Sequence, residues 1–169
     1  MLIDLSEILM QTGRTTQKEA DIEFDKLHIR GEDVKVIKKE KMKFMLKNLA
    51  KNVIELETEI KLTLSFSCNR CLDEVRKDFD LKITKEIDMT NPDSEEQEFM
   101  ENNFLDVDIL VTTEIVPELP MKVLCNENCK GICRKCGNNL NKKECNCDRT
   151  ELDPRMAKIL DIFNEYKEV

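Results

Sequence analysis

The sequence predicts an α+β fold, in which a mainly antiparallel sheet with one or two helices precedes a C-terminal cysteine-rich module. Two long segments alternate apolar and charged residues, an apolar series with helical spacing follows them, and eight cysteines lie in close pairs. At 169 residues the chain is long enough for one sizeable core and a small appended unit. We therefore divide it into a β-rich domain over residues 1–120 and a cysteine-rich module with a C-terminal helix over residues 121–169.

The strands are predicted from alternation. Residues 54–66 place apolar side chains at almost every second position, and the same pattern resumes over residues 79–89. A period of two buries one face of a strand and leaves the other in water. Two such segments so close together predict an antiparallel hairpin with Cys68 to Cys71, the motif CNRC, at its turn. Upstream, residues 21–29 and 32–37 are expected to be strands, and residues 41–46 carry a weaker strand pattern.

Two helices are predicted. The acidic, polar segment 91–103 opens with Asn-Pro and is expected to be a loop. Asp106 then precedes apolar residues with helical spacing, which predicts a capped helix near residues 106–116. Pro117 lacks a backbone donor and clashes with the preceding turn, so we expect this helix to end or kink near Val116. Asp153-Pro154 is a typical start for the C-terminal helix.

The charge is acidic overall and unevenly distributed. A formal net charge of −8 argues against a protein that coats nucleic acid through bulk electrostatics. Residues 35–51 nevertheless hold seven lysines and one acid, whereas residues 86–108 hold nine acids and no base. Such runs are usually solvated faces. A basic face that docks on RNA is the alternative interpretation of the lysine-rich run.

No feature of the sequence indicates a membrane partner. The first residues contain Asp4 and Glu7, which secretory signals lack, and no segment approaches the ~20 apolar residues that span a bilayer. We expect a cytoplasmic location. In that reducing compartment, closely spaced cysteines bind metal more often than they form disulfides.

The eight cysteines form four pairs with metal-ligand spacing. Two thiolates a few residues apart can turn toward one ion, and two such pairs complete a tetrahedron around zinc. The segment CRKCG is similar to the knuckle of zinc ribbons, in which glycine permits a positive φ after the second cysteine. With CNC eight residues later, it predicts a zinc-ribbon-like site of Cys133, Cys136, Cys145 and Cys147.

The other two pairs leave the number of zinc ions at one or two. Cys68 and Cys71 complete a second site with Cys125 and Cys129 if the fold brings the hairpin tip beside Leu124. In a different arrangement, Cys125 or Cys129 joins Cys133 and Cys136. Spacing alone leaves both arrangements open.

Besides structural zinc, the cysteines have three alternative uses: a redox dithiol, an iron–sulfur cluster and a catalytic metal site. Redox dithiols usually sit at a helix N-terminus, whereas Cys68 and Cys71 are predicted at a strand turn. Iron–sulfur clusters also accept four thiolates. A four-thiolate site leaves no open position for catalysis, the single histidine, His28, is remote from the cysteines, and no phosphate loop or nucleophile motif is present. We therefore expect a protein that is not an enzyme and has no small-molecule substrate.

Several ordered motifs resemble a known family. They are SCNRCLDEV (67–75), ELP (118–120), LCNENCKGICRKCGNNLN (124–141), CNC (145–147) and DPRMAKIL (153–160). Together they are similar to the YceD family of large ribosomal RNA subunit accumulation proteins, in its cysteine-rich, clostridial-type bacterial members. The N-terminal third agrees with the family in strand character only. The resemblance implies a role in processing or accumulation of large-subunit ribosomal RNA and in large-subunit biogenesis.

Two functional hypotheses follow. In the first, the zinc-stabilised tail presents Lys130, Arg134, Lys135, Lys142 and Lys143 to ribosomal RNA or to a large-subunit ribosomal protein. In the second, the protein is an adaptor whose acidic stretch from Glu86 to Asp108 engages a basic partner. A thiol redox protein is a third class, which predicts turnover of a disulfide substrate.

Overall fold

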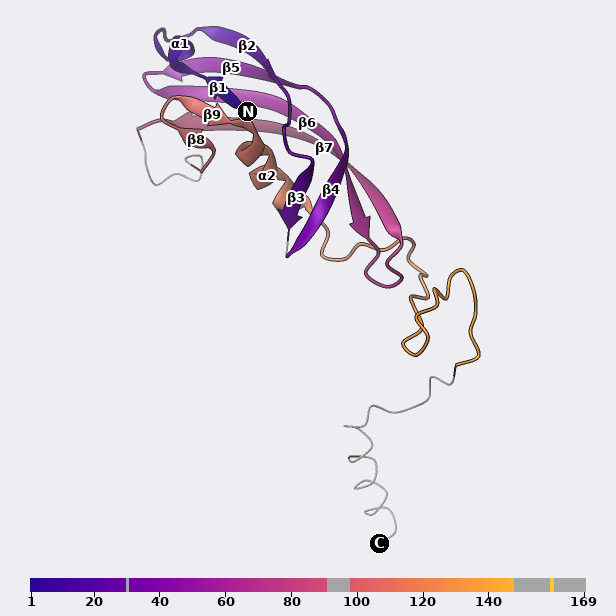
Figure 1. The fold of residues 1–169 in the computed structure, drawn as a ribbon. Helices are drawn as coiled ribbons and strands as arrows, with labels where there is room; N and C mark the ends of the chain where they lie inside the picture. The colour runs from indigo at the N-terminus through magenta and orange to yellow at the C-terminus, as the bar shows by residue number, and fades with distance from the viewer. Residues whose placement is uncertain (30, 91–97, 148–158, 160–169) are drawn as a thin grey trace.

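A computed structural model describes residues 1–29, 31–90, 98–147 and 159. In this part of the chain, two antiparallel sheets and helix α2 make one core, and the cysteine-rich module lies beyond one end of the larger sheet (Figure 1). The larger sheet consists of β2 (Thr15–Ala20), β3 (Lys26–Ile29), β4 (Glu32–Lys39), β5 (Met42–Ala50), β6 (Val53–Ser67) and β7 (Glu74–Asp88). The smaller sheet consists of β1 (Leu2–Asp4), β9 (Phe104–Asp106) and β8 (Met100–Glu101), and the helices are α1 (Ser6–Leu9) and α2 (Val107–Glu118). The predicted α+β class is confirmed.

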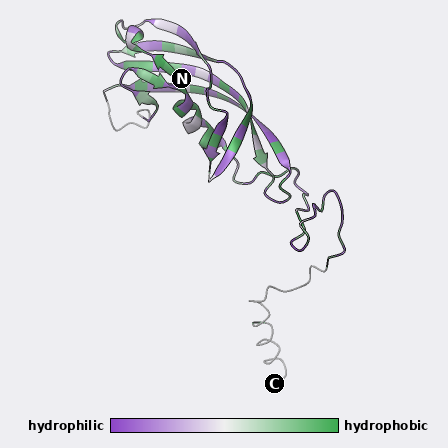
Figure 2. Ribbon diagram, in the orientation of Figure 1, coloured by the Kyte–Doolittle hydropathy of each residue, from purple (hydrophilic) through white to green (hydrophobic). Residues whose placement is uncertain are grey.

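Strand β6 is the centre of the larger sheet. It pairs with β7 along its whole length, while β5 and β4 pair with successive parts of it. Its alternate residues from Ile54 to Leu64 are buried, and the residues between them face water. The period of two that predicted this strand therefore separates the core from the outer face, and Figure 2 shows the alternation as stripes along the strands.

The hairpin predicted from the two alternating segments is confirmed. Its register runs from Val53 opposite Asp88 to Ser67 opposite Glu74, so Cys68 to Cys71 lie in the tip. Both strands are fifteen residues long. At about 3.4 Å per residue, the hairpin is long enough to carry its tip well away from the core that α2 covers.

Helix α2 begins as predicted and ends later. The Asp106 carboxylate accepts from the amides of Asp108 and Ile109, which caps the first turn. The helix continues to Glu118 instead of ending near Val116. Pro117 lies in the last turn, where only one turn is affected by its missing donor, and the Leu119 amide still reaches the Val116 carbonyl.

Several other boundaries correct the sequence prediction. Residues 21–25 are not a strand, because β3 begins at Lys26 and Ile22 packs into the core from an irregular segment. Strand β2 was not predicted, since TTQKEA has too few apolar residues to show an alternation. Strand β8 lies in the segment expected to be a loop. Apart from Ile159, the predicted C-terminal helix lies outside the described residues, as does the segment 91–97.

Within the described residues, no helix combines the length and the apolar character that crossing a bilayer requires.

Candidate metal centres

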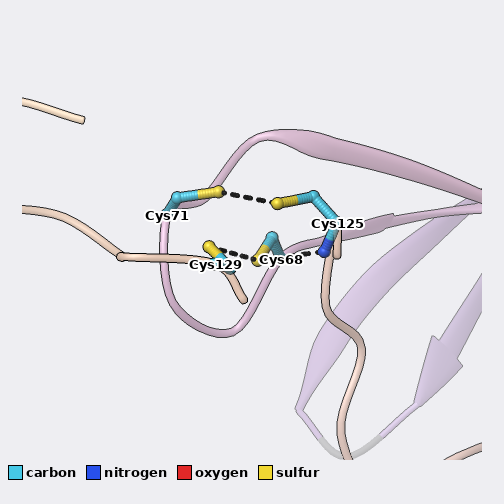
Figure 3. Close-up of side chains that lie close together, drawn as sticks. All are labelled: Cys68, Cys71, Cys125 and Cys129. Atoms are coloured by element: carbon cyan, nitrogen blue, oxygen red, sulfur yellow. Dashed lines mark hydrogen bonds between the residues drawn. The ribbon is translucent and has the colours of Figure 1, made fainter. Parts of the chain in front are cut away.

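The first candidate centre joins the hairpin tip to the module. The sulfur atoms of Cys68, Cys71, Cys125 and Cys129 all lie within 4.8 Å of one another. Cys68 and Cys129 are 3.8 Å apart at Sγ, and Cys71 and Cys125 are 3.5 Å apart (Figure 3). A tetrahedral zinc site with Zn–S bonds of about 2.3 Å has S–S edges of about 3.8 Å. The quartet therefore has the dimensions of a four-thiolate zinc site.

The turn at the hairpin tip places the first two sulfurs. The Cys68 amide donates to the Asp73 carbonyl at 2.8 Å, and the Leu72 amide donates to the Cys68 carbonyl at 3.0 Å. Leu72 adopts a φ of 62°, which closes the turn in the left-handed region. The Cys125 amide lies 3.4 Å from the Cys68 sulfur, so a backbone donor from the module also faces this thiolate.

The module docks on the tip through hydrogen bonds as well as through cysteines. Asn69 and Val123 exchange two bonds, one of 2.8 Å between main chains and one of 2.7 Å to the Asn69 side chain. The Ile132 amide donates to the Arg70 carbonyl at 3.1 Å, and the Arg70 guanidinium donates to the Cys129 carbonyl at 3.0 Å. These hydrogen bonds hold the module against the tip alongside the cysteines.

Asp73 adds a charged connection at the base of the tip. Its carboxylate accepts from Lys142 Nζ at 2.7 Å and from the Asn139 amide group at 2.8 Å. The hydrogen bond from Lys142 holds the pKa of Asp73 below its usual value, against a smaller opposing effect of desolvation. Asn141 donates to the Cys129 sulfur at 3.2 Å, which extends the network to the first centre.

The second candidate centre lies wholly within the module. The sulfurs of Cys133, Cys136, Cys145 and Cys147 also lie within 4.8 Å of one another. Cys133 is buried, Cys136 is exposed and the other two are half-buried. The Gly137 amide donates to the Cys133 carbonyl at 2.8 Å, and Gly137 has the positive φ, 72°, expected of the knuckle. This centre is the more exposed of the two.

The electrostatics of both quartets favour thiolates at particular positions. Burial opposes ionisation of Cys68, but amide donors of Arg70, Cys71 and Cys125 outweigh it and lower the Cys68 pKa to about 6. Amides of Cys136 and Lys135 lower the pKa of Cys133 to about 6 as well. Metal binding requires thiolates, so these amide donors favour the ionised form of the cysteines that would bind a cation.

Cys71 and Cys147 have raised pKa values, because neighbouring sulfur atoms oppose their ionisation. The Asp73 amide favours the Cys71 thiolate, but desolvation and the neighbouring sulfurs raise the Cys71 pKa to about 12. Cys136 and Cys145 raise the pKa of Cys147 to about 12. A divalent cation at the centre of each quartet would remove this mutual repulsion. The donor set, four soft sulfurs per site, fits zinc or iron.

The structure thus brings together the tail quartet that the sequence favoured and the quartet at the hairpin tip that it left open. It does not adopt the arrangement that mixes Cys125 or Cys129 with Cys133 and Cys136. Metal ligation by these residues stays a prediction. His28 lies in β3 with its ring 2.9 Å from the Asp33 carboxylate, outside both quartets. Sequence reasoning missed Asn69, Asp73 and Asn141, because hydrogen bonds around a site leave no spacing pattern.

The lysine-rich run 35–51 is largely neutralised. Five of its lysines lie within 4.0 Å of a carboxylate, and several of these partners come from other elements. The pairs are Lys38–Glu40, Lys39–Asp25, Lys41–Asp21, Lys43–Glu19 and Lys47–Glu55. This mixed surface favours the solvated-face interpretation over an RNA-docking face.

Part of the acidic stretch also has an internal role. Asp106 caps α2, and Asp108 accepts from the Met1 ammonium at 2.6 Å and from the Glu23 amide at 2.9 Å. The Asp108 and Glu23 carboxylates raise the pKa of the Met1 ammonium, overcoming the opposing effect of desolvation. These acids hold the N-terminal segment against α2.

Comparison with known proteins decides the family. The family model described as large ribosomal RNA subunit accumulation protein YceD matches residues 56–163, more than half of the chain. The chain belongs to the YceD family. The YceD match begins in β6 and includes β7, α2 and all eight cysteines. The resemblance found in the sequence motifs is therefore confirmed.

A curated YceD relative matches a shorter stretch. It is the large ribosomal RNA subunit accumulation protein YCED homolog 1, chloroplastic, of Arabidopsis thaliana, which is 50% identical over 36 residues. That stretch covers 21% of this chain and 11% of the relative. No solved structure matches the chain.

Proposed function

We propose that this YceD protein is a cytoplasmic, non-enzymatic factor that supports accumulation of large-subunit ribosomal RNA during assembly of the large ribosomal subunit. Its two quartets of cysteines hold structural zinc. Zinc at the first quartet fixes the module to the tip of the β6–β7 hairpin, and zinc at the second closes the knuckle of the module. The fixed module then contacts ribosomal RNA or a large-subunit ribosomal protein.

The observation that carries this proposal is the first quartet, which unites cysteines 61 residues apart in the chain. A closed set of four thiolates has no position for substrate, so its best use is to join two parts of the fold. In the described residues the module has little apolar core of its own beyond buried Val123 and Leu140. Metal binding therefore supplies much of its folding free energy.

Exposed basic residues of the module are the proposed contacts with RNA. From Met121 to Cys147 the side chains include six bases and two acids. Lys142 and Lys130 are paired with Asp73 and Glu144. Arg134, Lys135 and Lys143 are exposed beside the second quartet. Each four-thiolate zinc centre carries a charge of −2, so binding would depend on these individual cations and not on net charge.

The test is sedimentation of the full-length protein with large-subunit precursors in lysates made at low salt. The variant Arg134→Ala/Lys135→Ala/Lys143→Ala is expected to be absent from the precursor fractions. Its affinity for RNA should also depend less steeply on salt concentration. The matched control, Lys41→Ala/Lys43→Ala/Lys47→Ala, removes three lysines that face carboxylates on the sheet and should sediment like the unmodified protein.

Three outcomes would contradict the proposal. Unmodified protein found only in ribosome-free fractions would exclude association with the subunit. Equal effects of the two triple variants would mean that charge, not the module, controls binding. Loss of binding only when the exposed acids Glu98 and Glu101 are neutralised would favour the adaptor hypothesis. Turnover of a disulfide substrate that depends on Cys68 and Cys71 would instead favour a redox protein.

A further inference from the structure

Strand β7 has one edge that the described part of the chain leaves unpaired. All fifteen of its residues lie opposite residues of β6, and it pairs with no other described strand. In Figure 1 it follows the border of the larger sheet, in the order β2, β5, β6, β7. An edge of this length presents a row of backbone donors and acceptors that can pair with another strand.

We propose that β7 pairs antiparallel with β7 of a second copy of this chain, about a two-fold axis that passes through Leu81 perpendicular to the sheet. The resulting dimer has one continuous sheet. This symmetry keeps outer-face residues opposite outer-face residues, and it places positions equally distant from Leu81 opposite each other. The sequence of β7 can therefore be tested for complementarity with itself.

Near this axis the outer face of β7 is complementary in charge. At the two ends of the strand Glu74 faces Asp88 of the second copy, but Glu74 already pairs with Arg76 of its own chain. Asp80 faces Lys82 of the second copy, and Arg76 faces Glu86; symmetry produces each pair twice. All four side chains are exposed in the single chain. Opposite charges directly across an antiparallel pair stabilise it, and like charges destabilise it.

The apolar residues of the inner face would face one another across the axis. Leu81 faces its own copy, Phe79 faces Ile83 and Val75 faces Ile87. Phe79, Leu81 and Val75 are only half-buried in the single chain, although they pack against its apolar clusters. A neighbouring strand would cover the side that they leave in water.

The least favourable pair on the inner face joins two lysines, and one of them is already balanced by a carboxylate of its own chain. Lys77 would face Lys85 of the second copy. The Lys85 ammonium lies 2.7 Å from the Glu114 carboxylate of α2 in its own chain, with both side chains about three-quarters buried, so much of its charge is already balanced.

Other positions of the axis are disfavoured by like charges. An axis at Asp80 or at Lys82 would place that residue opposite its own copy. An axis at Phe79 would oppose Asp78 with Asp80, and an axis at Ile83 would oppose Asp80 with Glu86. The charged pattern that usually protects an edge from pairing disfavours these neighbouring registers close to their axes. The register at Leu81 opposes like outer-face charges only at the strand ends, Glu74 and Asp88.

The test measures mass by sedimentation equilibrium over a concentration series, with reductant present to prevent disulfide-linked species. The unmodified protein is expected to reach twice the 19.8 kDa chain mass. Arg76→Glu opposes two glutamates and Glu86→Arg opposes two arginines, so each variant alone should dimerise at least about tenfold more weakly. An equimolar mixture of the two variants restores both pairs of opposite charge and should recover the dimer.

Glu57→Arg is the matched control, because Glu57 is an exposed outer-face residue of β6 that does not lie at the free edge. It should dimerise like the unmodified protein. A single-chain mass for the unmodified protein at every concentration overturns the proposal, as does a dimer that neither β7 variant weakens. If each β7 variant dimerises more weakly but their equimolar mixture does not recover the dimer, the pairing centred on Leu81 is excluded.

Discussion

The Cys68 and Cys129 sulfur atoms lie 3.8 Å apart although 61 residues separate them in the chain. Cys68 directly follows β6, a strand of the sheet core, whereas Cys129 belongs to a module with few buried apolar residues. An ion held between them would connect a part that folds through apolar burial to a part with little apolar core of its own.

Substitution of the hairpin cysteines should remove one metal ion of two. In Cys68→Ser/Cys71→Ser the first quartet keeps only two thiolates, while the second quartet lies within the module and is intact. We expect about two zinc ions per chain in the unmodified protein and about one in this variant. Elemental analysis of protein purified without added metal, together with a visible spectrum, makes the measurement.

The reciprocal variant, Cys133→Ser/Cys136→Ser, is the control and should also retain about one zinc ion. Loss of both ions in the hairpin variant would mean that the second centre depends on the first. Iron with visible absorption would replace the zinc interpretation by an iron–sulfur one.

Removal of metal should affect the module and spare the sheet. The buried cluster that contains Phe44, Leu56 and Leu110 has no cysteine, so a chelator leaves its contacts intact. We expect amide hydrogen exchange to accelerate strongly over residues 123–147 and to remain slow in β5 and β6. Exchange followed by mass spectrometry, with and without chelator, measures this difference. Equal acceleration of β6 would indicate that the whole chain folds only with metal.

The sequence specified the parts of this fold that are periodic. Strands β6 and β7 were predicted because one face of each is buried and the other is wet, and Asp106 was predicted because caps have strong residue preferences. Strand β2 was missed because its six residues include a single buried one, Ala20. Its place depends on pairing with β5, which local sequence does not encode.

One cysteine quartet could be predicted from sequence spacing, whereas the other depends on the topology of the fold. Cys133 and Cys136 lie close in the chain to Cys145 and Cys147, so their quartet could be predicted from spacing. The first quartet needed the hairpin tip to meet Cys125, which depends on the length of β6 and β7 and on contacts such as Asn69 with Val123. Contacts between residues so far apart in the sequence depend on the fold and cannot be predicted from spacing.

The cap of α2 should contribute measurably to stability. Asp106→Ala removes the acceptor for the amides of Asp108 and Ile109, which lie 2.9 and 3.3 Å from the carboxylate. We expect the free energy of unfolding to fall by about 1 kcal/mol, as for other N-caps. Asp106→Asn keeps an acceptor oxygen and is the control, expected to lose less. Denaturant unfolding checks both, and equal losses would argue against the cap.

Gly131 should be essential for docking of the module, and Gly137 gives a matched comparison. Both have a positive φ, 78° and 72°, so alanine adds comparable backbone strain of about 1 kcal/mol at either position. A Cβ at Gly131 would also lie 3.1 Å from the Arg70 carbonyl, whereas a Cβ at Gly137 meets nothing within 4 Å. The same Arg70 carbonyl accepts the Ile132 amide, so displacement would break a docking bond.

We therefore expect Gly131→Ala to accelerate amide exchange at the hairpin tip. We also expect it to lower the zinc affinity, measured against a chelator, by roughly tenfold more than Gly137→Ala does. A tenfold change in affinity corresponds to about 1.4 kcal/mol. Competition with a chromogenic chelator provides the affinity and exchange provides the location. Equal effects of the two variants would mean that only backbone strain matters, and the contact between the module and the Arg70 carbonyl would then have no part in holding the first centre together.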